Sequence, residues 1–268
     1  MRSNITPPLP AMRNPGFADY AALIRPEICA LTAGAVYTSA MVSGGTNPAN
    51  AVTFAALSAL LICAGIMSLL RYFSQEQDGI LPHTALAASI TFFVAATLSA
   101  FPLGANMALI SIAAFLFSLI YFWKLRRVTL LGNLAFAALV VGPFIFGALL
   151  SVNPLPGLFL ASFLFLAAAG ADIYNGVAAM MNGKNTTSIA EKYGVNRART
   201  IAAAFLLLAI AISFVPFGIG IEGYIYVFFA LAADMLLLMA ISFHKNAVII
   251  TAFSAVLMAI AFGAAGVA

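Results

Sequence analysis

The chain has 268 residues, of which 64% are apolar and only 7% are charged, and its mean hydropathy is +1.08. A water-soluble domain of this length needs a charged exterior, so this composition excludes one and indicates a chain solvated by lipid. The net charge is +4, but the basic residues form neither a basic helix nor an RNA-binding motif. We therefore expect no nucleic-acid partner.

Nine apolar stretches are each long enough to supply the roughly 20 helical residues that cross a hydrocarbon layer. In chain order they lie at about 20–42, 50–70, 84–102, 106–122, 131–151, 156–177, 200–219, 223–242 and 247–266. Long runs such as 201–215 do not alternate between polar and apolar residues, as strands of a membrane barrel would. The sequence predicts an all-α integral membrane protein of about nine transmembrane helices around a central cavity.

The first 19 residues are polar and rich in Pro and Asn, and we interpret 1–19 as a cytoplasmic N-terminal tail. Residues 20–268 are then a single transmembrane domain of two similar halves, at about 20–122 and 131–242, followed by a ninth helix. Polar loops follow the second and sixth predicted helices, four helices apart on the same side of the membrane. We expect both loops to face one shared cavity.

The Lys and Arg residues fall in the N-terminal tail, at the start of the first helix and in every second connection between helices. The intervening connections carry none; they lie at about 43–49, 103–105, 152–155 and 220–222. Because cytoplasmic loops hold the excess of basic residues, we expect the N-terminus inside and the C-terminus outside. Anionic membrane lipids are the expected partners of many of these charges.

The end of the second predicted helix carries Arg71, Ser74 and Asp78, whose three- and four-residue spacing places them on one helical face. One interpretation is a polar wall that binds a lipid headgroup. The other is an ordinary helix end that reaches water and holds one internal ion pair.

A basic segment follows the fourth predicted helix, where Tyr121 precedes Lys124, Arg126 and Arg127. Three cations within four residues are able to bind a phosphate or diphosphate through charge-assisted hydrogen bonds. Alternatively, basic residues beside Tyr121 and Trp123 are an interfacial belt that orients the chain in the membrane.

Two carboxylates lie within predicted spans, where an ionised side chain costs roughly 2.5–3.5 kcal/mol on insertion scales. Asp172, with Asn175 one turn later, either faces the cavity or makes a structural hydrogen bond. Asp234 has no cation near it in the sequence, and we interpret it as a buried packing residue. Cys29 and Cys63 have no metal-like spacing, which favours two small apolar side chains over a disulfide or metal site.

The order of these segments resembles the UbiA family of intramembrane prenyltransferases, and the resemblance covers most of the chain. Arg25-Pro26 resembles the family's opening Arg-Pro. The segment YFWKLRRVTLLGNLAFAALVVGPFIFGAL (121–149) is similar to its Tyr…Lys-Arg…Thr…Gly-Asn segment and the Gly-Pro of its fifth helix. The segment ADIYNG…NGKNTTSIAEKYG resembles the one that ends in Thr-Leu-Pro…Gly. The resemblance implies nine helices, an inner-facing cavity and a prenyl diphosphate bound through Mg²⁺ by two Asp-rich motifs.

Both Asp-rich motifs differ in this chain. The family's Asn-Asp-x-x-Asp-x-x-x-Asp corresponds to LRYFSQEQD at 70–78, which keeps only the last acid. The two acids of the second motif correspond to Ala179 and Gly183, or to Val177 and Met181. No carboxylate lies between Asp172 and Glu191. The resemblance thus implies Mg²⁺ as the cofactor, with only Asp78 and Glu76 as candidate ligands.

Arg71 stands where the family has an acid, which suggests that cations take over the role of the metal. We hypothesise that four basic residues neutralise the anionic headgroup directly: Arg71, Lys124, Arg127 and Lys184. With Ser74, Asp78, Tyr121, Asp172 and Asn175, they form the predicted headgroup site.

Three functions fit these observations. The first is a divergent prenyltransferase that moves an isoprenoid chain from a prenyl diphosphate to an acceptor at the cytoplasmic membrane face. The second is a non-catalytic relative that binds or carries an isoprenoid phosphate lipid, or serves as a subunit of another membrane enzyme. The third is a small secondary transporter, although transporters break helices near the midplane with Gly or Pro, whereas most Pro residues here lie at helix ends.

Overall fold

The computed structural model of the chain describes residues 24–44, 49–74, 82–183, 189–243 and 246–265. Within these ranges every regular element is a helix. The long helices are α2 (Pro26–Val42), α3 (Ala49–Ser74), α4 (Pro82–Ala100), α5 (Ala105–Trp123), α6 (Thr129–Ala148), α7 (Leu155–Met181), α9 (Val195–Ser213), α11 (Tyr224–Ser242) and α12 (Ala247–Ala265). Short helices occupy Phe101–Leu103, Leu125–Arg127, Ile189–Tyr193 (α8) and Val215–Gly218 (α10).

Each predicted span corresponds to one of these long helices. Among the described residues, eight helices are long and apolar enough to cross a membrane. The ninth, α2, has 17 residues, which is at the lower end of the roughly 17–25 that span a bilayer. The chain is therefore a multi-pass all-α membrane protein, as predicted.

Proline residues interrupt two predicted spans. In the first, Ile24 is helical, Arg25 has a left-handed backbone with φ of 51°, and α2 begins at Pro26; residues 20–23 lie outside the described residues. The residue before a proline is disfavoured in the right-handed helical region, so the helix starts at the proline itself. The predicted span 200–219 is divided into α9 and α10 because Pro216 has no amide hydrogen to continue the helix.

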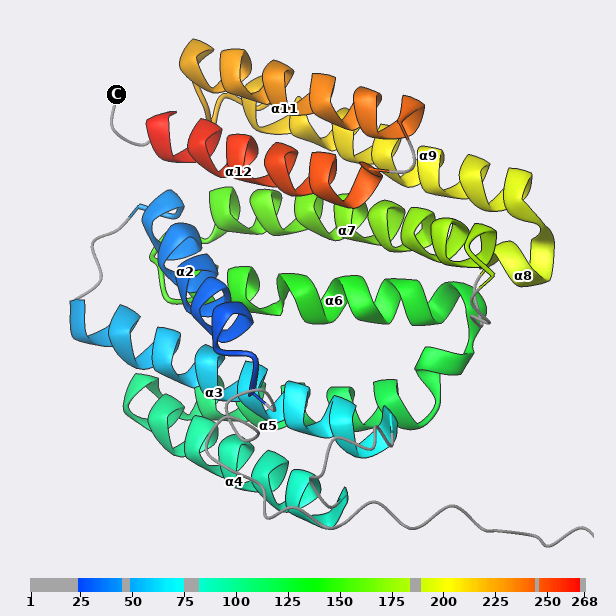
Figure 1. Cartoon of the computed structure of the whole chain (residues 1–268). Helices are drawn as coiled ribbons and strands as arrows, with labels where there is room; N and C mark the ends of the chain where they lie inside the picture. The colour runs from blue at the N-terminus through cyan, green and yellow to red at the C-terminus, as the bar shows by residue number, and fades with distance from the viewer. Residues whose placement is uncertain (1–23, 45–48, 75–81, 184–188, 244–245, 266–268) are drawn as a thin grey trace, which may run out of the picture.

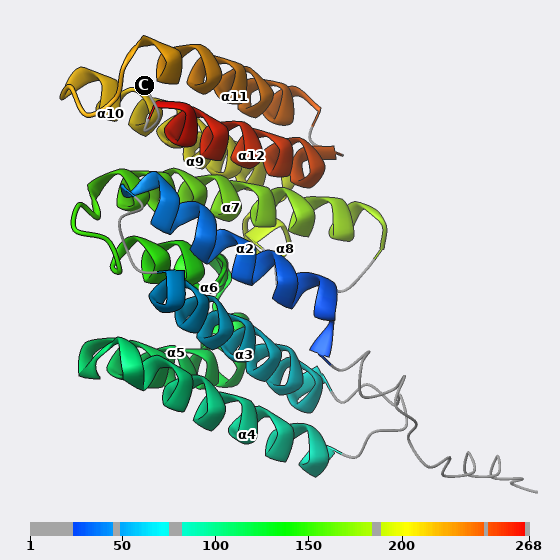
Figure 2. The ribbon, with the colours of Figure 1, turned by 90° about the vertical axis from the view of Figure 1, so that its left-hand side faces the viewer.

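The helices form layers on either side of α6 and α7 (Figure 1). The helices α3, α4 and α5 lie on one side, α9, α11 and α12 lie on the other, and α2 crosses the face between them (Figures 1 and 2). Of the eight long apolar helices, α7 is the most buried. The similarity of the two halves stays a prediction.

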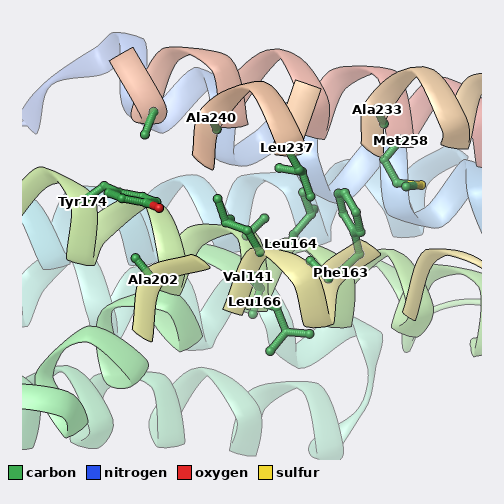
Figure 3. Packing of buried hydrophobic residues seen from close by; sticks show 14 of the residues in the cluster. Val141, Phe163, Leu164, Leu166, Tyr174, Ala202, Ala233, Leu237, Ala240 and Met258 are labelled. Atoms are coloured by element: carbon green, nitrogen blue, oxygen red, sulfur yellow. The ribbon is translucent and has the colours of Figure 1, made fainter. Parts of the chain in front are cut away.

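The largest core cluster lies between α7 and the three C-terminal helices, with Val141 of α6 beside it (Figure 3). Lipid tails are as apolar as the core, so helices in a membrane associate through close packing, which small residues allow. Gly170 of α7 is such a residue, because a Cβ there would lie 3.0 Å from the carbonyl oxygen of Ala202 in α9. Because one face of α7 packs closely against the C-terminal helices, its opposite face is directed toward α2 and α6.

All basic residues of the described chain except Arg25 gather at one side of the bundle. There α3, α5 and α7 end and α6 and α9 begin, which is the right-hand side of Figure 1. We call this side the basic face; its residues are Arg71, Lys124, Arg126, Arg127, Lys192, Arg197 and Arg199.

Asp234 lies in a buried polar cluster between α9 and α11. Its side chain is only 4% exposed, and the Ser213 hydroxyl donates a 2.7 Å hydrogen bond to Oδ2. The Tyr226 hydroxyl donates to the Ser213 carbonyl oxygen at 2.6 Å, whereas Oδ1 of Asp234 has no hydrogen-bond partner in the described structure. The structure thus agrees with the interpretation of Asp234 as a buried packing residue.

We expect Asp234→Asn to keep or raise the thermal stability of the purified protein. The amide oxygen still accepts the hydrogen bond from Ser213, while the cost of burying an ionisable group without an opposite charge is removed. The change in the free energy of unfolding should be within about 1 kcal/mol of zero or favourable. Thermal unfolding in detergent measures it, and a large loss of stability would show that the carboxylate has an essential charged partner.

Candidate functional site

A cavity of about 1860 Å³ lies among α2, α3, α5, α6, α7 and α12. Most of its wall is apolar, and its polar groups concentrate where α5 ends, α6 begins and α7 approaches its end. We call this region the polar end; its residues are Tyr121, Arg126, Thr129, Asn133, Asp172 and Asn175. It lies toward the basic face, so the cavity combines a long apolar wall with one polar end.

Helical periodicity places the polar residues on the cavity side of α6 and α7. Thr129 and Asn133 are four residues apart in α6, and Asp172 and Asn175 are three residues apart in α7. The Asn133 side-chain amide donates a 2.7 Å hydrogen bond to Oδ2 of Asp172. This bond joins α6 to α7 within the cavity wall.

Arg126 reaches the cavity because the short helix Leu125–Arg127 packs closely on the first turn of α6. A Cβ at Gly132 would lie 2.9 Å from the Leu125 carbonyl oxygen, so only glycine allows this contact without movement of the backbone. The contact sets the direction of Arg126, which lines the cavity. Lys124, Arg126 and Arg127 are all exposed, but only Arg126 belongs to the cavity wall.

The structure brings together three residues of the predicted headgroup site: Tyr121, Asp172 and Asn175 all line the cavity. Arg71 and Ser74 are half-buried at the end of α3, outside the cavity wall. The Ser74 hydroxyl donates to the Arg71 carbonyl oxygen at 3.3 Å, as at an ordinary helix end.

Three predicted residues, Asp78, Glu76 and Lys184, lie outside the described residues. The predicted headgroup site also leaves out three members of the polar end, Thr129, Asn133 and Arg126, although Arg126 was among the three cations considered for phosphate binding. The four-residue spacing of Thr129 and Asn133, next to the basic segment, was a usable signal. No local signal distinguishes Arg126 from its basic neighbours.

The described part of the cavity does not fit a pair of magnesium ions. Its only lining carboxylates are Glu27, in the first turn of α2, and Asp172. No three His, Cys, Asp or Glu side chains converge anywhere in the described ranges. Magnesium takes one or two carboxylates per ion together with substrate phosphates.

Both cysteines are free and buried. Cys29 and Cys63 pack with Ala64 in one small cluster between α2 and α3. Cys63 also lines the cavity.

Three solved structures share this fold. A digeranylgeranylglyceryl phosphate synthase superimposes with a TM-score of 0.80 at 18% identity, over 92% of this chain and 97% of its own. A UbiA homologue from Aeropyrum pernix K1 gives 0.74 at 15% identity, over 91% and 98% of the two chains. A UbiA homologue from Archaeoglobus fulgidus, bound to DMAPP and Mg²⁺, gives 0.68 at 14% identity, over 91% and 99%.

Sequence similarity decides the family. The digeranylgeranylglyceryl phosphate synthase of Methanopyrus kandleri is 30% identical over 241 residues, which cover 82% of this chain and 86% of that protein. The chain belongs to the UbiA family of prenyltransferases. The synthase of Thermococcus kodakarensis is 29% identical to this UbiA protein over 223 residues, or 76% and 79% of the two chains. No family model matches the chain.

Membership in the UbiA family makes this protein a prenyltransferase, as the sequence predicted. The isoprenoid chain of a prenyl diphosphate suits the apolar wall of the cavity, and the diphosphate suits the polar end that contains Arg126.

Proposed function

We propose that this UbiA-family prenyltransferase adds a geranylgeranyl group to a glyceryl phosphate lipid that already carries one isoprenoid chain. The relatives named digeranylgeranylglyceryl phosphate synthase support this choice of acceptor, because their product carries two such chains on one glyceryl phosphate. The observation that carries the proposal is the cavity, which is apolar over most of its wall and polar at one end.

The size of the cavity supports two long substrates. Small-molecule sites have volumes of roughly 300–1,000 Å³, and the volume here is about 1860 Å³. A donor and an acceptor that each carry an isoprenoid chain need this larger space, and both headgroups need the polar end.

The wall between α2 and α12 supports entry from the membrane. Leu31 of α2 and Val256 and Ile260 of α12 line the cavity although they are 74%, 58% and 44% exposed. Because these side chains both line the cavity and are exposed on the protein surface, the wall of the cavity is open between α2 and α12. Substrates dissolved in the bilayer would enter there without passing through water.

We place the basic face in the cytoplasm, with the N-terminus inside and the C-terminus outside. The excess of Lys and Arg on this side supports that orientation. Its exposed residues, among them Lys124 and Arg127, are then placed to contact anionic lipid headgroups. Labelling of single cysteines introduced at the two termini of the membrane-inserted protein would test the orientation.

The experiment that tests the acceptor is a transfer assay in nanodiscs. Radiolabelled geranylgeranyl diphosphate is supplied with geranylgeranylglyceryl phosphate or with a panel of aromatic acceptors, and native mass spectrometry measures binding of each substrate. We expect transfer to the glyceryl phosphate lipid. Donor binding without transfer to any acceptor would favour the non-catalytic alternative, which the missing carboxylates of the Asp-rich motifs support.

We further propose that cations neutralise the donor diphosphate in place of the family's magnesium sites. Arg126 in the cavity wall supports this, and Arg71 and Lys184 remain members of the proposed set. We expect donor binding to persist in EDTA and to weaken in Arg71→Ala. Titration of the donor with and without Mg²⁺ measures this, and a strict requirement for Mg²⁺ would contradict it.

A further inference from the structure

The hydrogen bond between Asn133 and Asp172 lies in the polar end, where the proposed function places both headgroups. Prenylation of a glyceryl phosphate lipid, the proposed function on which this inference rests, forms an ether from a hydroxyl group. That hydroxyl must lose its proton as the new bond forms, and a positioned side chain that accepts the proton speeds this step.

The polar end contains few groups able to accept that proton. Among the described residues Asp172 is its only carboxylate, and the other polar groups are the amides of Asn133 and Asn175, the phenol of Tyr121, the hydroxyl of Thr129 and the guanidinium of Arg126. Amides and a guanidinium do not act as bases in proteins. The other lining carboxylate, Glu27, is on the separate helix α2.

The contact with Asn133 holds the carboxylate in one orientation. The Asn133 amide donates to Oδ2 at 2.7 Å, which is a short, well-formed hydrogen bond. With Oδ2 engaged by α6, the carboxylate cannot rotate freely, and Oδ1 is the oxygen left to accept from a substrate. Asn133 therefore orients Asp172 in the way that a second group orients the base in many acid–base sites.

We propose that Asp172 is the general base of the transfer reaction and that Asn133 is the residue that positions it. The acceptor hydroxyl oxygen bonds to C1 of the geranylgeranyl group while the bond from C1 to the diphosphate oxygen breaks. The electron pair of that bond leaves with the diphosphate. The hydroxyl proton passes to Oδ1 of Asp172 and is released to solvent with the product.

The test compares Asp172→Asn with Asp234→Asn, the same substitution at a buried carboxylate remote from the cavity. A general base contributes about 10²- to 10⁴-fold to the rate, so we expect kcat of Asp172→Asn to fall by that factor. Donor binding, measured by native mass spectrometry, should remain within about 3-fold of the wild type. Asp234→Asn should keep the wild-type kcat.

A thiol acceptor separates proton removal from structural damage. In this analogue sulfur replaces the reacting hydroxyl oxygen, and a thiol with a pKa of about 8.5 ionises without a base. At pH 8.5 we expect Asp172→Asn to transfer to the thiol within about 10-fold of the wild type. Formate should partly restore transfer to the hydroxyl acceptor in Asp172→Ala, because it fits the space of the missing carboxylate.

Asn133 is tested as a positioning residue. We expect Asn133→Ala to lower kcat on the hydroxyl acceptor by about 10-fold or more, with little change in KM and little loss with the thiol acceptor. If Asp172→Asn keeps kcat within 3-fold, or loses activity equally with both acceptors, the assignment of the base is wrong. If the wild type itself transfers nothing to the glyceryl phosphate lipid, the proposed function is wrong, and the base assignment is wrong with it.

Discussion

Arg126→Ala is expected to weaken binding of a prenyl diphosphate by about 10- to 150-fold. A hydrogen bond to a charged group contributes about 1.5–3 kcal/mol, and 1.4 kcal/mol corresponds to a factor of ten. Arg126 is the only Lys or Arg among the described residues of the cavity wall, so its loss leaves the diphosphate without a cation from that wall. Isothermal titration with geranylgeranyl diphosphate measures the effect.

The neighbouring cations are the matched controls for Arg126. Lys124→Ala and Arg127→Ala remove the same charge from the same short segment, and all three side chains are exposed, but only Arg126 lines the cavity. We expect each control to change donor affinity by less than about 3-fold, because an exposed charge outside the cavity wall is screened by solvent and contributes little. Equal losses in all three variants would indicate that the segment acts through its total charge. A loss in Lys124→Ala and Arg127→Ala but not in Arg126→Ala would favour the sequence-based assignment.

Gly147→Ala is expected to lower the melting temperature by about 2–12 °C. A Cβ at Gly147 in α6 would meet the carbonyl oxygen of Val36 in α2, and backbone cannot rotate away as a flexible side chain does. Overpacking costs about 1–3 kcal/mol, and each kcal/mol shifts Tm by about 2–4 °C for a chain of this size. The Ser39 hydroxyl donates to the Phe144 carbonyl oxygen at 2.6 Å in the same contact, so α2 would have to move away from α6.

Gly142→Ala is the control for this substitution. It lies in the same helix, but a Cβ there meets nothing within 4 Å. Alanine in a helix is favoured over glycine by roughly 0.5–1 kcal/mol, so we expect Tm to stay the same or rise slightly. Thermal unfolding of both variants in the same detergent measures the difference. A similar loss in both would mean that glycine at these positions serves backbone flexibility and not close packing.

The membrane helices were predictable because their signal is local. A span needs roughly 20 consecutive apolar residues, and each of the nine stretches meets that requirement without reference to the others. The two interruptions of predicted spans also have a local cause, since Pro26 and Pro216 determine where a helix begins or ends. Predicted ends elsewhere differ by a few residues, as for α7, which continues to Met181 instead of 177.

The candidate site was only partly predictable. Tyr121, Asp172 and Asn175 stood out because polar groups are costly within apolar helices, and all three line the cavity. Arg126 did not stand out, because three cations within four residues look alike in a sequence. Its direction depends on the contact between Gly132 and the Leu125 carbonyl oxygen, which exists only once the helices have packed.

By itself, the sequence determined that this protein crosses the membrane many times, that its basic residues gather at one face and that its segments follow the UbiA order. These properties depend on composition, spacing and order along the chain. Only the tertiary structure decided that Asn133 meets Asp172, because the two residues are 39 positions apart and on different helices. A hydrogen bond of 2.7 Å between them requires α6 and α7 to pack in one register, which no single segment specifies.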